Sequence, residues 1–497
     1  MKKTITLLFA LFTGVLSAQT VNIQGGASYP TITDAITAAV SGDVILITGT
    51  HTESVSIDKS ITLRGSNPAT DIIQAAAAPA ATGLGTRVIS IGAAAAAALN
   101  VTVENLTIRH GNFNANGGGI NVDKVTGLVN LNNLIVANNF TTTNGGAIGV
   151  AGSNVNITNC TLQNNSCTLD GGAIIAAPNN GSSVSNVVNI SQSLLNTNTA
   201  RNGGGIYING NNGFGNNYKI DVNIVNSTIS NNTTTSAASG NGGGAIFTAC
   251  AFWTGDGVTG NVTLKLVHAT VFNNTHAAPL RAGLRFAGVV GSLTNFSAFN
   301  SIIVANNDVL IKALNFQNTN TTNVVNCILG GLELAPTLVD DTAKNNLKGR
   351  TATEAGLTGA LSNEGGNTQV IKLNDASNGV DFCTAATGIS IPTFDQRGYL
   401  RAGTQDAGAY ELGGTLSVGK EIFQNNSVSI YPNPAREMVT ISGLNNVNSI
   451  KVYSILGSLE KEIHNQNEFN VSDLSAGVHL VMIESDGQKI MKRIIIK

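Results

Sequence analysis

Apolar and polar residues alternate in a short pattern that recurs between residues 101 and 329. Each copy places two apolar residues at alternating positions, then a polar residue, then a small or apolar one. The polar residue is in turn Asn105, Asn133, Asn159, Gln192, Asn226, His268, Asn300 and Asn326, and the successive spacings are 28, 26, 33, 34, 42, 32 and 26 residues. Alternation over four to five residues predicts a strand, and a repeat of this length is typical of a solenoid.

A second signature follows the first at a nearly constant distance. It reads Asn or Asp followed by two glycines, and it begins at Asn116, Asn144, Asp170, Asn202 and Asn241. Glycine adopts positive φ angles readily and Asn or Asp favours tight turns, so each repeat has a second fixed corner. The intervals show no apolar periodicity of helical length. The repeats therefore predict an all-β chain, a right-handed parallel β-helix with coils about 4.8 Å apart.

The recurring amides suggest a hydrogen-bonded ladder inside the coil, because stacked asparagines satisfy one another along the stack. An exposed turn asparagine is the alternative, since the chain is rich in asparagine throughout. Cys160 and Cys327 follow an amide at a position that elsewhere holds serine or alanine. We expect two small buried thiols there, with a Cys160–Cys167 disulfide as the alternative. No cysteine spacing indicates a metal site, and no cofactor is predicted.

Charge is scarce in the repeats. The chain has 497 residues, a formal net charge of −2 and 11% charged residues. Only six charged residues occur between Gly111 and Cys250. Asparagine, serine and threonine must therefore provide the polar groups that hydrate the surface of this region. This composition argues against a nucleic-acid partner, which would require a basic surface.

The amino terminus predicts export. Lys2 and Lys3 precede an apolar run over residues 5–16, so we expect a signal peptide at residues 1–18. No other segment has the length of a transmembrane helix. Residues 29–65 predict a helix at 32–40, a buried strand at 44–47 and a first coil. They resemble the amino-terminal cap of the pectinesterase-like and pectate-lyase-like β-helix superfamily, which implies that they cover one end of the stack.

Residues 19–415 are predicted to form the β-helix with both of its caps. Near its end the chain reads Asp-Gln-Arg-Gly at 395–398 and Asp-Ala-Gly-Ala-Tyr-Glu at 406–411. Together with the Gly-Gly turns, this resembles the choice-of-anchor Q β-helix family. We interpret the segment as a carboxy-terminal cap in which Asp395, Arg397, Arg401, Asp406 and Glu411 pair, with an active site as the alternative.

The composition changes after residue 420. Residues 420–497 contain 16 charged residues, and seven short alternating runs predict a small antiparallel, immunoglobulin-like β-sandwich. Tyr-Pro-Asn-Pro at 431–434, Leu-Ser-Ala-Gly at 474–477 and the terminal Lys-Arg-Ile-Ile-Ile-Lys resemble the type A sorting domain of the type IX secretion system. The resemblance implies a source in the Bacteroidota, contact with that secretion machinery, and an extracellular or outer-membrane-surface location after both terminal segments are removed.

Three functions are compatible with this organisation. A polysaccharide lyase or esterase acting on an acidic glycan would place carboxylates in register on adjacent coils. Asp123, Asp170 and Asp221 have no acidic equivalent one coil away, so no catalytic residue is predicted and enzymatic activity is not favoured. A passive surface spacer needs no site.

An adhesin-like protein that binds a glycan or a host surface is the third function. Long intervals follow Gly205 and Gly244, and they carry several aromatic residues. We predict a ligand-binding patch that comprises Tyr207, Trp253, Asp256, Arg281 and Arg285. Aromatic faces stack on sugars and guanidinium groups bind carboxylates or sulfates, although the aromatics also suit local loop packing.

Overall fold

A computed structural model describes most of the chain. The described residues are 19–178, 185–210, 219–238, 242–250, 261–277, 283–288, 293–304, 312–316, 321–333, 344–375, 377–384, 390–416, 428–444, 447–454, 459–464, 466–485 and 488–497. They fall into two compact units, Met1–Thr415 and Leu416–Lys497. The predicted signal peptide lies outside the described residues.

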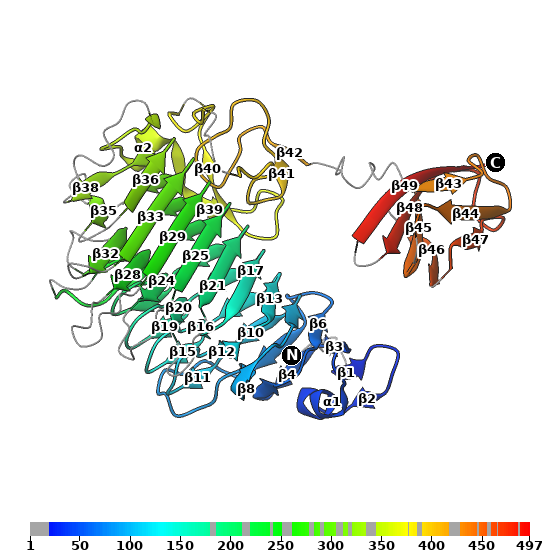
Figure 1. The fold of residues 1–497 in the computed structure, drawn as a ribbon, viewed down its shortest axis with the longest axis horizontal. Coiled ribbons are helices and arrows are strands. Elements are labelled where there is room, and N and C mark those ends of the chain that lie inside the picture. Colours follow the sequence, from blue (N-terminus) through cyan, green and yellow to red (C-terminus); the bar gives the residue numbers. More distant parts are fainter. Residues whose placement is uncertain are drawn as a thin grey trace, which may run out of the picture. The chain divides into compact units, whose positions relative to one another are not determined.

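The first unit is a parallel β-helix whose coils run through four sheets in the order A, B, D, C. Sheet A comprises β2 (Ser28–Tyr29), β1 (Thr20–Ile23), β3 (Val44–Thr48), β6 (Thr62–Gly65), β9 (Val101–Glu104), β13 (Leu128–Asn132), β17 (Asn154–Thr158), β21 (Asn186–Ser191), β25 (Lys219–Val225), β29 (Asn261–Val267), β33 (Leu293–Phe299) and β36 (Thr321–Val325). Figure 1 shows these strands stacked as one layer along the length of the unit.

The other three sheets complete each coil. Sheet B comprises β4 (Thr50–Thr52), β7 (Ile72–Gln74), β10 (Thr107–Arg109), β14 (Ile135–Ala137), β18 (Thr161–Gln163), β22 (Leu194–Asn196), β26 (Thr228–Ser230), β30 (Thr270–Phe272), β34 (Ile302–Val304) and β37 (Ile328–Leu329). Sheet D comprises β11 (Asn112–Phe113), β15 (Phe140–Thr141), β19 (Ser166–Cys167), β23 (Thr199–Ala200), β27 (Thr233–Thr234) and β31 (Thr275–His276). Sheet C comprises β5 (Val55–Ile57), β8 (Ile89–Ala97), β12 (Ile120–Val125), β16 (Ile148–Ala151), β20 (Ile174–Ala177), β24 (Ile206–Asn209), β28 (Ile246–Cys250), β32 (Leu284–Gly288), β35 (Lys312–Phe316) and β38 (Gly331–Glu333).

Equivalent residues of successive coils stack in register. Val129 pairs with Val101 on one side and Val155 on the other, and all three are fully buried in the hydrophobic core. Because alternate strand residues face inward, the apolar positions of the repeat build one continuous core. The predicted fold class is confirmed. Strand β8 extends through most of the alanine run, as far as Ala97.

The polar position of each repeat lies at the corner between sheets A and B, where φ is between 46° and 56°. We call these residues the outer column: Asn105, Asn133, Asn159, Gln192, Asn226, His268, Asn300, Asn326 and the additional Asn345. Four neighbouring pairs bond along the column, for example Asn133 Nδ2 to Asn105 Oδ1 at 2.9 Å. Their side chains lie outside the coil, so the predicted inward ladder is wrong at these positions. The interior of that corner is taken by the following small residue, such as Cys160 or Ser193.

An inward ladder exists one corner further along, between sheets B and D. It comprises Asn139, Asn165, Asn198, Asn232 and Asn274, all at most 2% exposed. The Nδ2 of each of the first four donates to the Oδ1 of the next asparagine at 2.9–3.0 Å. Each also donates to a carbonyl oxygen of the preceding coil, as Asn198 Nδ2 does to Leu162 O at 2.9 Å. We call these five residues the inner ladder.

Four cysteines carry free thiols: Cys160, Cys167, Cys327 and Cys383. Cys160 and Cys327 are buried in the core, as predicted, and the alternative Cys160–Cys167 disulfide is absent. Burial raises the pKa of both core thiols to about 12. They are therefore small, un-ionised core residues at neutral pH.

The amino-terminal end of the stack is closed by α1 (Ile32–Ala38), close to the predicted helix, and by the antiparallel strands β1 and β2. Thr31 caps the helix by accepting a hydrogen bond from Asp34 N at 3.0 Å. Ile32 and Ala35 then contribute its buried face to the core. The predicted strand is β3, which pairs with β1 on one side and β6 on the other.

The carboxy-terminal segment differs from the predicted end cap. Residues 351–412, which we call the strap, contain α2 (Ala352–Ala355), β39 (Leu357–Ser362), β40 (Val370–Leu373) and β41 (Tyr399–Leu400); β41 pairs with β42 (Thr415–Leu416). The strap folds back along the outside of the β-helix beside its last coils (Figure 1). It covers Phe272, Ile302, Val304 and Ile328 of sheet B with apolar side chains such as Val370. These four side chains point away from the core of the coil and would form an apolar patch on sheet B without the strap. The strap therefore lies along sheet B.

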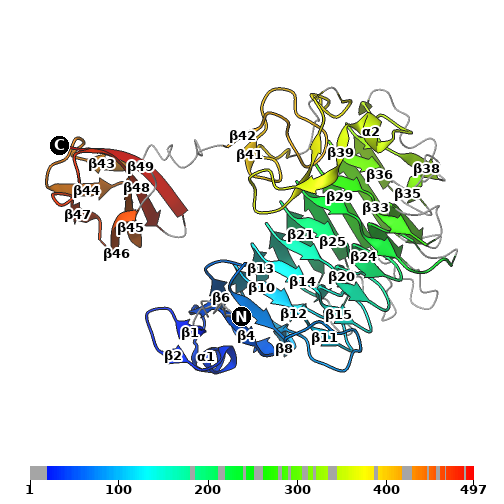
Figure 2. The ribbon, with the colours of Figure 1, turned by 180° about the vertical axis from the view of Figure 1, so that it is seen from behind.

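The second unit has two antiparallel sheets, seen from two sides in Figures 1 and 2. One comprises β43 (Ser429–Tyr431), β44 (Met438–Ser442) and β47 (Glu468–Asn470); the other comprises β46 (Leu459–His464), β45 (Ser449–Ser454), β48 (Gly477–Ser485) and β49 (Gln488–Ile496). Val439, Ile450 and Ile483 contribute to its core. The seven predicted runs are these seven strands. In the described part of the chain, no helix has the length and apolarity to cross a membrane.

Candidate functional site

The outer face of sheet C brings part of the predicted patch together. Ile175, Tyr207, Phe247 and Arg285 pair in register on four successive strands, β20, β24, β28 and β32. Their neighbours Ile174, Ile206 and Ile246 face the core, so these four side chains face away from it. We call them the sheet C column.

The members of this column contact one another closely. The rings of Tyr207 and Phe247 stack with centroids 5.4 Å apart, and the Arg285 guanidinium carbon lies 5.8 Å from the Phe247 centroid. Tyr207 is 8% exposed and Arg285 is 3% exposed. Burial raises the pKa of the Tyr207 hydroxyl.

Tyr207 was expected on an excursion beyond the Gly-Gly turn, and the structure places it on strand β24 instead. The physical reason is the alternation of Ile206 and Ile208, which extends the strand and fixes Tyr207 on its opposite face. Trp253, Asp256 and Arg281 lie outside the described residues. The column thus unites Tyr207 with Arg285, and the patch as a whole stays a prediction.

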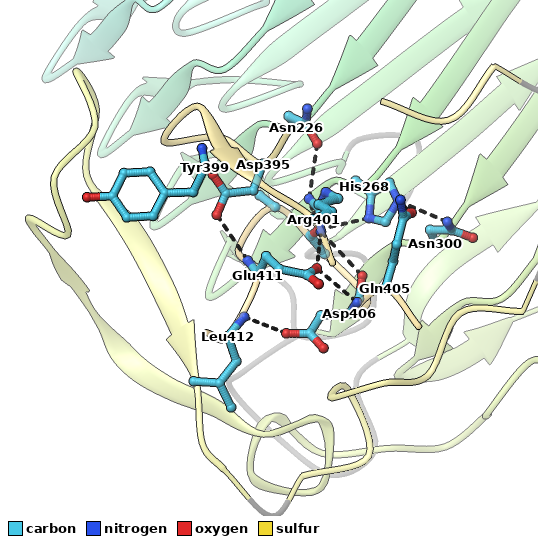
Figure 3. Close-up of polar contacts among 12 residues, drawn as sticks. Asn226, His268, Asn300, Asp395, Tyr399, Arg401, Gln405, Asp406, Glu411 and Leu412 are labelled. Atoms are coloured by element: carbon cyan, nitrogen blue, oxygen red, sulfur yellow. Dashed lines mark hydrogen bonds and ion pairs between the residues drawn. The ribbon is translucent and has the colours of Figure 1, made fainter. Parts of the chain in front are cut away.

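A buried polar network lies where the strap crosses the outer column (Figure 3). The Arg401 side chain is fully buried and pairs with Glu411 at 3.0 Å. It also donates to Asn226 Oδ1 at 3.1 Å and to the Gly408 carbonyl oxygen at 2.9 Å. A second pair joins Arg397 to Asp395 at 2.7 Å, and both side chains are almost fully buried. Four of the five predicted charges therefore pair, whereas the Asp406 carboxylate accepts backbone N–H groups.

His268 belongs to the same network. Its Nε2 lies 2.9 Å from both Gln405 Oε1 and Asn300 Nδ2, and its Nδ1 lies 3.3 Å from the Gly408 carbonyl oxygen. Burial, and secondarily the charge of Arg401, hold the pKa of His268 well below its usual range. The imidazole is therefore neutral at physiological pH and serves as a member of the outer column.

The carboxylates of the network accept backbone hydrogen bonds. Asp395 accepts from the N–H groups of Arg397, Tyr399 and Glu411. Asp406 accepts from Asp381 N at 2.8 Å and from Leu412 N at 2.6 Å. Burial raises the pKa values of Asp406 and Glu411. These acids fix the fold of the strap, so the arrangement favours a clasp over an acid–base site.

The acids of the coils are separate from one another. Asp170 sits between Asn144 and Asn202 in its column, and Arg201 Nη2 binds its carboxylate at 2.8 Å. Asp221 pairs with Lys219 at 2.8 Å on sheet A. Across the described residues, no group of three or more histidine, cysteine, aspartate or glutamate side chains is arranged to hold a metal ion.

Comparisons with known proteins identify the second unit. Residues 429–497 match the family model for a secretion system C-terminal sorting domain. The chain thus carries a signal for export by the type IX secretion system to the cell surface or the medium. Searches of curated proteins and of solved structures gave no significant match. The resemblance of the β-helix to the choice-of-anchor Q family stays a prediction.

Proposed function

We propose that the exported β-helix is an adhesin-like protein that binds an extracellular glycan on the outer face of sheet C. The observation that carries this proposal is the in-register column of Tyr207, Phe247 and Arg285. In the sequence, Phe247 and Arg285 flank the stretch that contains Trp253, Asp256 and Arg281. In this proposal the column positions the patch, because its own side chains are nearly buried.

The composition supports binding in preference to a purely passive role. A surface of amides and hydroxyls offers donors and acceptors that match those of sugars, without fixed charge. A lyase or esterase is the alternative, and the described acids give it no support. Asp170 is held by Arg201, and the network acids bind backbone N–H groups.

Glycan-array binding of the secreted protein tests the proposal. Trp253→Ala is expected to weaken binding to the captured glycan about thirtyfold or more, because a buried aromatic anchor typically contributes about 2 kcal/mol. Leu84→Ala is the control, since it removes a 90% exposed apolar side chain outside the predicted patch. No binding to any glycan or host surface would contradict the proposal and favour the spacer.

Export is tested separately. Deletion of residues 420–497 is expected to leave the protein in the periplasm, because it removes the sorting domain. The measurement is cell fractionation with surface labelling. Unchanged surface display of the truncated protein would contradict a role of this domain in export.

A further inference from the structure

We propose that a pocket near the amino-terminal end of the sheet C face binds an uncharged sugar residue. The inference deepens the proposed function, because it adds a subsite and a ligand class to the same face. The pocket has a volume of about 420 Å³, and its lining includes Arg87, Asn114, Asn121, Asp123, Thr143 and Ala151. This volume falls within the roughly 300–1,000 Å³ of small-molecule sites.

The floor of the pocket follows from residue size on three adjacent strands. Asn121 of β12 pairs with Gly149 of β16, and Gly149 pairs with Ile175 of the sheet C column. A Cβ atom at Gly149 would lie only 2.7 Å from Asn121 Oδ1. Glycine at this position therefore leaves room for the Asn121 amide. Ala151, two residues later on the same outward face, leaves the neighbouring space open.

Asn121 has an unused side-chain amide in this floor. It is half-buried, and within the described residues its side chain makes no hydrogen bond. Buried polar groups in proteins are nearly always paired, so a half-buried, unpaired amide in a pocket favours a polar ligand. A carboxamide offers both a donor and an acceptor to a sugar hydroxyl.

Arg87 is held in a fixed orientation at the wall. Its guanidinium donates to Gly117 O at 2.7 Å, to Asn116 O at 2.5 Å and to Ser90 Oγ at 3.1 Å. Its guanidinium carbon also lies 4.7 Å from the centroid of the Phe113 ring. Burial lowers the pKa of Arg87 to about 10 against the attraction of Asp123, so the group stays charged at neutral pH.

The charges of the pocket indicate the class of ligand. Among the described lining residues, Arg87 and Asp123 are the charged ones, and their charges are opposite. A uronic acid or sulfated sugar would meet the Asp123 carboxylate as well as the guanidinium. A neutral sugar donates its hydroxyl protons to Asp123 and accepts from Asn121 and Arg87. The two opposite charges of Arg87 and Asp123 therefore favour uncharged sugars over acidic ones.

Saturation-transfer NMR on the full chain tests the inference. The probes are methyl glycosides of glucose, galactose, mannose and N-acetylglucosamine, with glucuronic and galacturonic acids for comparison. We expect at least one neutral glycoside to bind. Asp123→Asn should weaken its binding about tenfold, since hydrogen bonds to charged groups are the strong ones. Ala151→Phe should abolish binding by filling the pocket.

The control variant is Asp221→Asn, which neutralises a carboxylate on sheet A and should leave binding unchanged. Thermal unfolding of each variant shows whether it is folded. If a pocket variant does not fold, Asn121→Ala is tested in its place and is expected to weaken binding about fivefold. No binding of any neutral glycoside, stronger binding of the acidic sugars, or binding insensitive to the pocket variants would overturn the inference.

The two proposals fail in different ways. Polysaccharide binding that Trp253→Ala removes, together with no effect of Ala151→Phe, would overturn the pocket and leave the proposed function standing. Monosaccharide binding in the pocket without any polysaccharide or host-surface binding would overturn the proposed function and leave the pocket proposal standing.

Discussion

Asparagine occupies two neighbouring columns of this β-helix, and the columns differ in backbone conformation, in the direction of the side chains and in bonding. Residues of the outer column have φ near 50° and point away from the coil. Those of the inner ladder point inward and are at most 2% exposed. Asn198 shows the difference: its two Nδ2 protons and both acceptor positions of its Oδ1 are used within the stack.

Some side chains of the outer column find hydrogen-bond partners in the strap, outside the coil. The Asn133 side chain donates to its neighbour Asn105 in the column, whereas the Asn226 side chain donates to the Phe394 carbonyl oxygen of the strap at 2.6 Å. One residue type thus serves two purposes. An inward asparagine holds successive coils together, and an outward asparagine in the left-handed conformation makes a corner on which another segment docks.

Asn198→Ala should be the most damaging change to either column. It leaves the backbone N–H and one Nδ2 proton of Asn165 without acceptors inside the core. Two unsatisfied buried donors cost about 4 kcal/mol together. Denaturant unfolding of the full chain measures the loss. A decrease in the free energy of unfolding below about 1 kcal/mol would contradict a stabilising role of the inner ladder.

Arg401→Met should release the strap from the outer column. Removing one member of a buried ion pair leaves Glu411 uncompensated, at a cost of about 3 kcal/mol. Because the strap is local, limited proteolysis should cut residues 351–412 sooner while the coils persist. The double variant Arg401→Met, Glu411→Leu should recover much of the loss; equal sensitivity of the coils would argue against a separate strap.

His268 gives the outer column a dependence on pH. Its pKa is lowered in the folded state, so below about 6.5 the unfolded chain binds the additional proton. Stability therefore falls as the pH falls below 6.5, by at most about 1.4 kcal/mol per unit. The raised pKa values of Asp406 and Glu411 act in the opposite direction. The difference between wild type and His268→Asn isolates the histidine, and identical pH profiles would refute its contribution.

Asn159→Ala should be the mildest change. Asn159 lies half-exposed in the outer column at φ 56°, away from the clasp formed with Arg401. Alanine in this conformation costs about 1 kcal/mol, and Asn159→Gly should cost less because glycine adopts positive φ freely. Thermal unfolding compares the two; a loss as large as that of Asn198→Ala would remove the distinction between the columns.

The repeat was sufficient to predict the parallel coils, because the alternation and the Gly-Gly corners are local signals. It also contained the inner ladder, which follows the outer column at a constant interval of six residues, from Asn133 to Asn139 and from His268 to Asn274. The outer position recurs in eight coils and the inner one in five, so the inward ladder was predicted at the outer position. Alternation alone does not tell an inward asparagine from an outward one at a corner where φ changes sign.

The strap and the site were harder to predict. The strap contacts coils more than a hundred residues earlier, as between Arg401 and Asn226, and no local pattern encodes such a distance. Tyr207 and Arg285 lie in one column of sheet C, and the ligand-binding patch to which both were assigned stays a prediction. Their burial was missed, because whether an outward strand residue is covered depends on the segments around it. Arg87 and Asn121 carry no motif, and only the register of β8, β12 and β16 brings their surroundings together.

From Asn105 to Asn326, successive members of the outer column are separated by as few as 26 and as many as 42 residues, yet the strands of sheet A that flank the longest interval pair in register. The variation falls mainly between the strands of sheet C and the following strands of sheet A, for example between Cys250 and Asn261. Mutation can lengthen or exchange the chain there without breaking a ladder bond. During evolution, such a scaffold is free to acquire new recognition loops in the way that antibody domains do, while the inherited frame stays unchanged.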